Sequence, residues 1–147
     1  SATVITGLDH LKAETVTIWS NGAAVASKVV SAGGSITLDA ATTKAHIGIG
    51  MTSDVKPLRL DPGDATFQGK EGTIYELVAR VFETIGYTYG VDTSNLDTKS
   101  HSSLRSDDDL LPFQGIFDTK SQFIMRKTDG GPMTILSLMP KFDKYEE

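Results

Sequence analysis

The chain has 147 residues, 39% of them hydrophobic and 22% charged, and this composition excludes a wholly disordered protein. Its formal net charge of -5 and its scattered Lys and Arg residues argue against a strong nucleic-acid-binding surface, which needs a basic face. The absence of Cys excludes disulfides, Cys-ligated zinc and thiol nucleophiles, and no stretch has the roughly 20 apolar residues of a membrane-spanning helix.

Residues 1–50 predict a small N-terminal β-module. Asn21-Gly22 tolerates the positive φ angles of a type I′ turn and predicts a hairpin. Gly33-Gly34 predicts a second turn. The β-branched, aromatic or alternating stretches around these turns predict strands at 15–19, 25–30, 35–38 and 45–49.

Residues 51–72 predict a connector, because Pro57, Pro62 and Gly63 interrupt any long element. Residues 55–60 within it could still form an edge strand, where Pro57 is tolerated. The next segment, 73–85, is open between two structures. Apolar residues recur at helical spacing, but β-branched and aromatic residues crowd the segment, and alternation with a period of two also fits.

The rest of the chain, with 73–85, predicts a C-terminal β-module over 73–147. Residues 92–110 are rich in Ser, Thr, Asn and Asp and predict a long exposed loop. Residues 113–117 and 122–126 regain strand character, and a turn follows at 129–132. The apolar run 133–139 predicts a last strand buried on both faces, and the charged residues 141–147 predict a frayed tail. The two modules could also pack as one domain.

The residues that could carry chemistry favour structural roles. His10, His46 and His101 share no metal-ligand spacing, so we expect all of them to be structural. The acidic run 107–109 could bind calcium, but it lacks the spacing of an EF-hand loop, and a solvated acidic loop fits better. Trp19 could form a platform for sugars, although a strand-ending core residue fits better.

No catalytic motif accompanies these residues. The chain contains no G-x-S-x-G nucleophile elbow, and neither Gly-Gly pair is followed by the Lys-Ser/Thr or helix of a phosphate-binding loop. Carboxylate pairs suited to glycoside cleavage can form only in the fold, and any chain with 19 acidic residues offers such pairs. We therefore expect no enzyme and assign no catalytic, cofactor-binding or metal-binding residue.

An ordered set of motifs over nearly the whole chain resembles a domain of bacteriophage tail proteins. Residues 7–11, 15–19 and 21–23 resemble its opening, "G-L-x-H-L-x-G-x-x-V-x-V-x-x-D-G", and 35–38 with 44–48 resemble its next two strands. Residues 67–70 and 74–84 are similar to its long strand, and Tyr89-Gly90 to the "V-G" after it. The segments 111–115 and 131–138 resemble its "L-F-T-G" and its closing "P-L-P-L-T-I-L-A-L".

The chain departs from the family's pattern at two places. Glu76 and Glu83 dilute the usual Arg-rich character of the long strand, and Ala13-Glu14 replace the usual Gly before the first long strand. The named relatives that the resemblance suggests are the tail nozzle proteins of short-tailed phages, also called tail tubular protein B. The resemblance favours a strand over a helix at 73–85.

The resemblance implies an all-β fold of one or two small modules of the β-sandwich or barrel type. It implies a fragment of a longer chain that acts as a structural component of a phage tail, of the nozzle or tail-tube type. The expected partners are other tail subunits in a homo-oligomeric ring, and the expected location is the virion, after synthesis in the bacterial cytoplasm. The alternative function is a glycan-binding or glycan-cleaving module that contacts the host surface, for which Trp19, the tyrosines and the acidic segment are the motivation.

Overall fold

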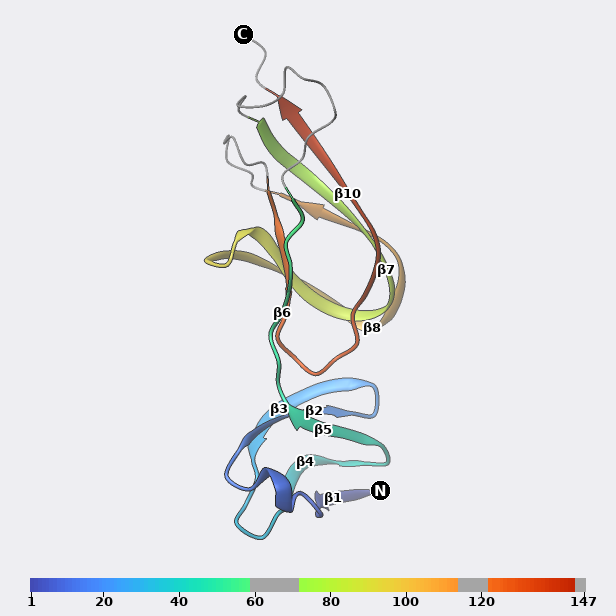
Figure 1. The fold of residues 1–147 in the computed structure, drawn as a ribbon. Helices are drawn as coiled ribbons and strands as arrows, with labels where there is room; N and C mark the ends of the chain where they lie inside the picture. The colour runs from blue at the N-terminus through green and yellow to red at the C-terminus, as the bar shows by residue number, and fades with distance from the viewer. Residues whose placement is uncertain (59–71, 114–121, 145–147) are drawn as a thin grey trace. The chain divides into compact units, whose positions relative to one another are not determined.

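The computed structural model describes residues 1–58, 72–113 and 122–144, and its regular structure is almost entirely antiparallel β (Figure 1). The only helical segment within these residues is a short 3-10 turn, η1 (Asp9–Leu11). The predicted all-β class is therefore confirmed. Close contacts divide the chain into two compact units, which are residues 1–52 with 128–132, and residues 53–127 with 133–147.

Unit 1 consists of two small antiparallel sheets that enclose one apolar core. One sheet has the order β1-β4 and the other β3-β2-β5. The strands are β1 (Ala2–Ile5), β2 (Thr15–Ser20), β3 (Ala23–Val29), β4 (Ile36–Thr42) and β5 (Ala45–Ile49). The buried residues of its core are Leu8, Val16, Ile18, Val30, Ile36 and Leu38. The strands predicted from residues 15 to 49 are all present.

The predicted hairpin joins β2 to β3, with φ angles of 49° at Asn21 and 85° at Gly22. The side chain of Asn21 also holds the turn between β4 and β5. Its Oδ1 accepts hydrogen bonds from the backbone N–H groups of Thr43 (3.1 Å) and Lys44 (3.3 Å), and its own backbone N–H donates to the carbonyl of Lys44 (2.9 Å). Asn21 therefore fixes two turns that are distant in sequence.

Unit 2 is built on one long, bent two-stranded ribbon. Its strands are β6 (Ser53–Val55), β7 (Gly72–Asp92), β8 (Asn95–Pro112), β9 (Ile124–Lys127) and β10 (Thr134–Lys144). The sheet order is β10-β7-β9-β6, and β8 pairs with β7 along most of its length. The segment 73–85 is thus a strand, as the resemblance implied.

The β7–β8 ribbon folds back on itself near the middle of β7. The pairing of β7 with β8 shifts register between Val81 and Thr84 and again between Thr84 and Gly86, and Glu83 takes a positive φ of 44°. Before the bend β7 pairs with β10, and after it residues 88–90 pair with β9. The bend therefore makes two layers out of one continuous strand (Figure 1).

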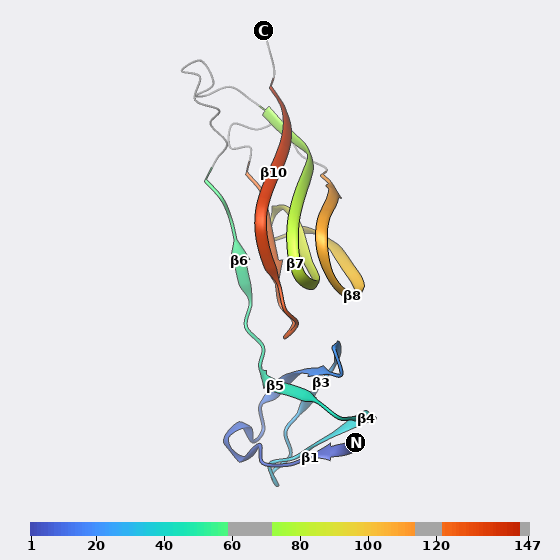
Figure 2. The same cartoon turned by 90° about the vertical axis from the view of Figure 1, so that its right-hand side faces the viewer.

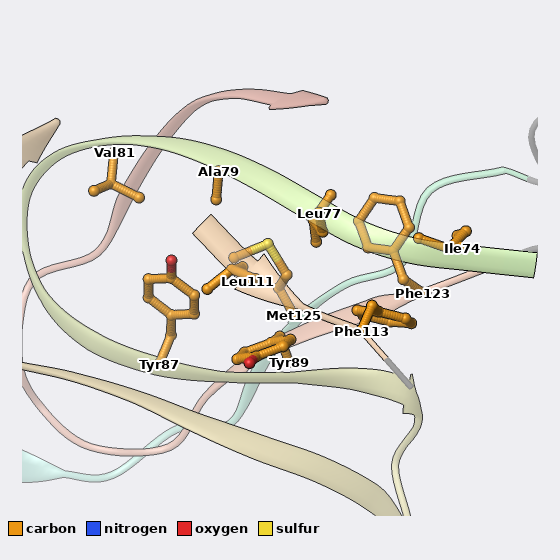
Figure 3. Close-up of a cluster of buried hydrophobic side chains, with 10 residues drawn as sticks. All are labelled: Ile74, Leu77, Ala79, Val81, Tyr87, Tyr89, Leu111, Phe113, Phe123 and Met125. Carbon is orange, nitrogen blue, oxygen red and sulfur yellow. The ribbon is translucent and has the colours of Figure 1, made fainter. Parts of the chain in front are cut away.

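The core of unit 2 lies between these two layers. Figure 3 shows Val81, Ala79, Leu77 and Ile74 on the first arm of β7 facing Tyr87 and Tyr89 on the returning arm. The remaining buried members are Leu111, Phe113, Phe123 and Met125. Phe113 meets the ring of Phe123 edge-on at a centroid distance of 6.4 Å, a favourable geometry for aromatic rings.

The predicted frayed tail is wrong at residues 141–144, which form the end of β10 and pair with β7. Two further predictions for this unit are wrong. The segment 92–110 is not a loop, because residues 95–112 form β8. The final strand is not buried on both faces: β10 pairs only with β7 among the described residues, and Leu136 is 61% exposed. Both errors have one cause, which is that local polarity is a poor guide to these two strands. β8 is a strand although most of its residues are polar, and β10 is partly exposed although most of residues 133–139 are apolar.

The predicted connector 51–72 contains β6, which lies at the edge of its sheet. The predicted edge strand at 55–60 overlaps β6 only at Val55, and its last two residues fall outside the described part of the chain. Most of the predicted strand 113–117 and the last residues of the tail also fall outside it. The turn at 129–132 belongs to unit 1.

Replacing Asn21 separates its two contributions to unit 1. Asn21→Gly keeps the positive φ and loses the side-chain hydrogen bonds, so we expect a loss of about 1 kcal/mol in the free energy of unfolding. Asn21→Ala adds the strain of a left-handed residue and should lose about 1 kcal/mol more. Urea unfolding followed by the fluorescence of Trp19, which lies in unit 1, measures both. Equal stability of the two variants would show that backbone strain plays no part.

Candidate functional site

The outer surface of β10, β7 and β8 in unit 2 is the strongest candidate for a functional surface. Figure 2 shows these strands side by side. Leu77, Ala79 and Val81 point into the core, so the alternate residues of β7 point away from it. We call this surface, centred on residues 76, 78 and 80 of β7, the outer face.

The register of the strands arranges the outer face in rows. In the middle row, Val78 lies between Met139 on β10 and Leu110 on β8. Leu110 is 61% exposed and Met139 37% exposed. Tyr75, Phe82 and Leu136, also from these strands, are exposed as well. Isolated exposed apolar residues need no explanation, but a contiguous apolar row is typical of an interaction surface.

Ion pairs occupy the rows on either side of the apolar row. In one row, Glu76 pairs with Lys141. In the other, Arg80 makes a two-pronged contact with Asp108, with Nε 2.7 Å from Oδ1 and Nη2 2.9 Å from Oδ2. The hydrogen bonds from Arg80 hold the pKa of the Asp108 carboxyl below its usual value. The charges of both rows are therefore balanced within the chain.

A buried carboxylate lies on the opposite side of β8 from this face. Asp109 follows Asp108 directly, and its side chain is fully buried. Its Oδ2 accepts hydrogen bonds from the hydroxyl of Tyr87 (2.7 Å) and from Nε2 of His101 (2.8 Å).

Arg105 completes the surroundings of Asp109. Its Nε lies 3.0 Å from Oδ1 of Asp109, and neither atom has a hydrogen-bond partner, so this contact is an ion pair only. Burial raises the pKa of the Tyr87 hydroxyl above its usual value, and the hydrogen bond to Asp109 raises it further. Tyr87 therefore stays a neutral donor at physiological pH.

This cluster joins the two arms of the bent ribbon. Tyr87 lies on β7 after the bend, whereas Asp109 lies on the part of β8 that pairs with β7 before the bend. The hydrogen bond between them spans the interior of the fold-back. We call Asp109 with Tyr87, His101 and Arg105 the clasp. Each of the three partners contacts the carboxylate of Asp109, and this arrangement suits a structural role.

The residues weighed as ligands in the sequence do not converge. His10 lies in η1, His46 lies in β5 of unit 1, and His101 lies in β8 of unit 2. No group of three or more His, Cys, Asp or Glu side chains suited to a metal occurs within residues 1–58, 72–113 and 122–144. Sequence inspection alone did not reveal that His101 contacts a buried carboxylate, since eight positions separate it from Asp109.

The acidic run 107–109 is neither a calcium loop nor a solvated loop. Asp107 pairs with Arg105 at 3.1 Å, Asp108 pairs with Arg80, and Asp109 is buried. Strand geometry sends consecutive side chains to opposite faces, which separates carboxylates that are adjacent in sequence. Three consecutive Asp residues show no alternation in the sequence, so no local signal separated the buried Asp109 from its neighbours.

Trp19 is not a core residue, contrary to the preferred interpretation of the sequence. It is half-buried and lies on the opposite face of β2 from Val16 and Ile18, which are core residues. Its cross-strand neighbours are Ala24 on β3 and His46 on β5. The indole ring therefore does not pack within the core of unit 1.

No protein-family model matches the sequence, and a search of the curated proteins finds no relative. The described part of the chain contains no helix long and apolar enough to cross a membrane.

Breaking the clasp should destabilise unit 2. Asp109→Asn removes the charge of the acceptor that Tyr87 and His101 share, and we expect a loss of about 2 kcal/mol in the free energy of unfolding. Tyr87→Phe removes one hydrogen bond and should cost about 1–2 kcal/mol. The control is Asp97→Asn, an exposed carboxylate elsewhere on β8, which should change stability by less than about 0.5 kcal/mol. Urea unfolding followed by circular dichroism measures all of these variants. An Asp109 variant as stable as the control would show that the clasp contributes nothing.

Shortening the polar segment of β8 provides a separate test of its structure. Replacing residues 98–108 with a short Gly-Ser bridge removes His101, Arg105 and Asp108 together with much of the β8 ladder. We expect unit 2 to lose its cooperative unfolding transition altogether, whereas shortening a true loop changes the free energy of unfolding by only about 0.6 kcal/mol per halving of length. A nearly unchanged thermal transition, measured by calorimetry, would restore the interpretation as a loop.

Proposed function

We propose that the protein is a structural component of a bacteriophage tail, of the nozzle or tail-tube type, and acts by protein–protein assembly without catalysis. The observation that carries the proposal is the outer face of β10, β7 and β8, where an apolar row lies exposed between balanced ion pairs. Such a surface favours binding to another protein, because its apolar side chains gain by leaving water and its charges need no external partner.

The motifs of the sequence supply the biological setting of the proposal. The resemblance to the tail nozzle proteins runs in order through both units, from residue 7 to residue 138. The all-β architecture agrees with what that resemblance implies. In this setting the partners are other tail subunits, the parent assembly is a homo-oligomeric ring, and the location is the virion.

The parent particle tests the proposal directly. Antibodies raised against the chain should label the tail in electron micrographs of intact phage particles. Labelling of the capsid alone would contradict a role in the tail. So would the absence of any label from particles in which mass spectrometry detects the polypeptide.

The outer face can be tested within the same particles. Leu110→Ser and Met139→Gln should each lower the yield of particles with complete tails by about tenfold or more, because interface residues near the centre of a contact dominate its energy. Leu104→Ser is the matched control, since Leu104 lies on β8 and is 49% exposed but is not part of the apolar row. A full yield from the Leu110 variant, with unchanged stability of the purified chain, would remove the outer face from the proposal.

A second candidate function is glycan binding at the host surface. The observation that favours it is Trp19, whose ring lies outside the core and beside His46 on the neighbouring strand. Aromatic rings available outside a core can stack on sugars. Binding of the chain to a glycan array, abolished by Trp19→Ala, would support this function, and hydrolysis of cell-wall sugars would extend it to cleavage.

A further inference from the structure

We propose that the outer face binds the outer face of a second copy of this chain, with the two copies related by a two-fold axis along the row Met139–Val78–Leu110. The inference rests on the proposed function only in taking the outer face as a contact surface. It names the partner and the geometry of that contact.

Charge is the first reason for a second copy as the partner. The chain carries a net charge of -5, so two copies repel each other over most approaches. On the outer face the charges cancel in pairs, Glu76 with Lys141 and Arg80 with Asp108. Two copies therefore meet there with little local repulsion, and an apolar row from each is available for burial.

The register supplies the second reason. Glu76 and Arg80 are equally distant from Val78, at two residues before and after it, and the pairing with β10 and β8 is regular from residue 76 to residue 80. A two-fold axis along the Val78 row exchanges the rows on either side of it. Each Glu76 then lies opposite Arg80 of the second copy, and the apolar rows lie against each other.

The other simple two-fold arrangement is unfavourable. An axis parallel to the strands would set Glu76 against Glu76 and Arg80 against Arg80, and like charges placed directly opposite weaken a contact. The charge pattern of the face thus selects one axis. A two-fold contact of this kind closes at two copies, so neighbours within a ring must meet through other surfaces.

The test reverses the ion pairs without breaking them. Sedimentation velocity on the purified chain should detect a weak dimer between about 10 and 500 µM, because contacts of modest area are transient. Glu76→Lys with Lys141→Glu keeps the internal pair but places the new lysine opposite Arg80 of the second copy. We expect this variant to dimerise about tenfold more weakly.

The matched reversal of the other row provides the decisive comparison. Arg80→Asp with Asp108→Arg should weaken the dimer by a similar factor, since the new aspartate then lies opposite Glu76. Combining both reversals restores opposite charges across the contact and should return the dimer to within about twofold of the original. Leu110→Ser should weaken it in every background.

Distinct results would overturn the proposal. A chain that stays monomeric over the whole concentration range contradicts it outright. A dimer that the double reversal fails to restore, while circular dichroism shows the variant folded, shows that the face binds a different surface. Because these measurements use the purified chain alone, they can fail while tail labelling of phage particles still supports the proposed function.

Discussion

The fold-back of β7 around the buried Asp109 carboxylate is the constraint on which unit 2 depends. A carboxylate removed from water costs several kcal/mol unless charged and hydrogen-bonding partners replace the lost hydration. Tyr87, His101 and Arg105 supply those partners from both arms of the ribbon. Only the folded-back ribbon brings Tyr87 to this carboxylate, so the bend and the hydrogen bonding of the buried Asp109 depend on each other.

The same bend explains why the unit has an exposed apolar face. Folding one long strand over itself buries a single side of each arm, with Leu77, Ala79 and Val81 facing Tyr87 and Tyr89. The remaining side of the first arm then has no second layer among the described residues. Its apolar row between two ion pairs is consistent with a surface that is stable in water and still gains from contact with another protein.

Sequence reasoning succeeded where local chemistry decides the structure and failed where distant pairing does. Asn21-Gly22 fixes its own turn through backbone angles, so the hairpin was predictable. The segment 95–110 is as polar as a loop, and only its ladder with β7 makes it a strand. Nothing in its run of three Asp residues marks Asp109 as the buried one. The surroundings of Asp109 come from residues 4 to 22 positions away and left no motif.

Hydrogen exchange of the unmodified chain tests the central claim, that β7 and β8 form one folded-back ribbon that presents the outer face. The backbone amides of residues 77–89 and 101–111 should exchange slowly and with similar opening free energies, because one cooperative unit contains them both. Fast exchange throughout residues 95–110, beside slow exchange in β7, would show a loop in place of β8. Without β8 the clasp and the outer face would not exist as described.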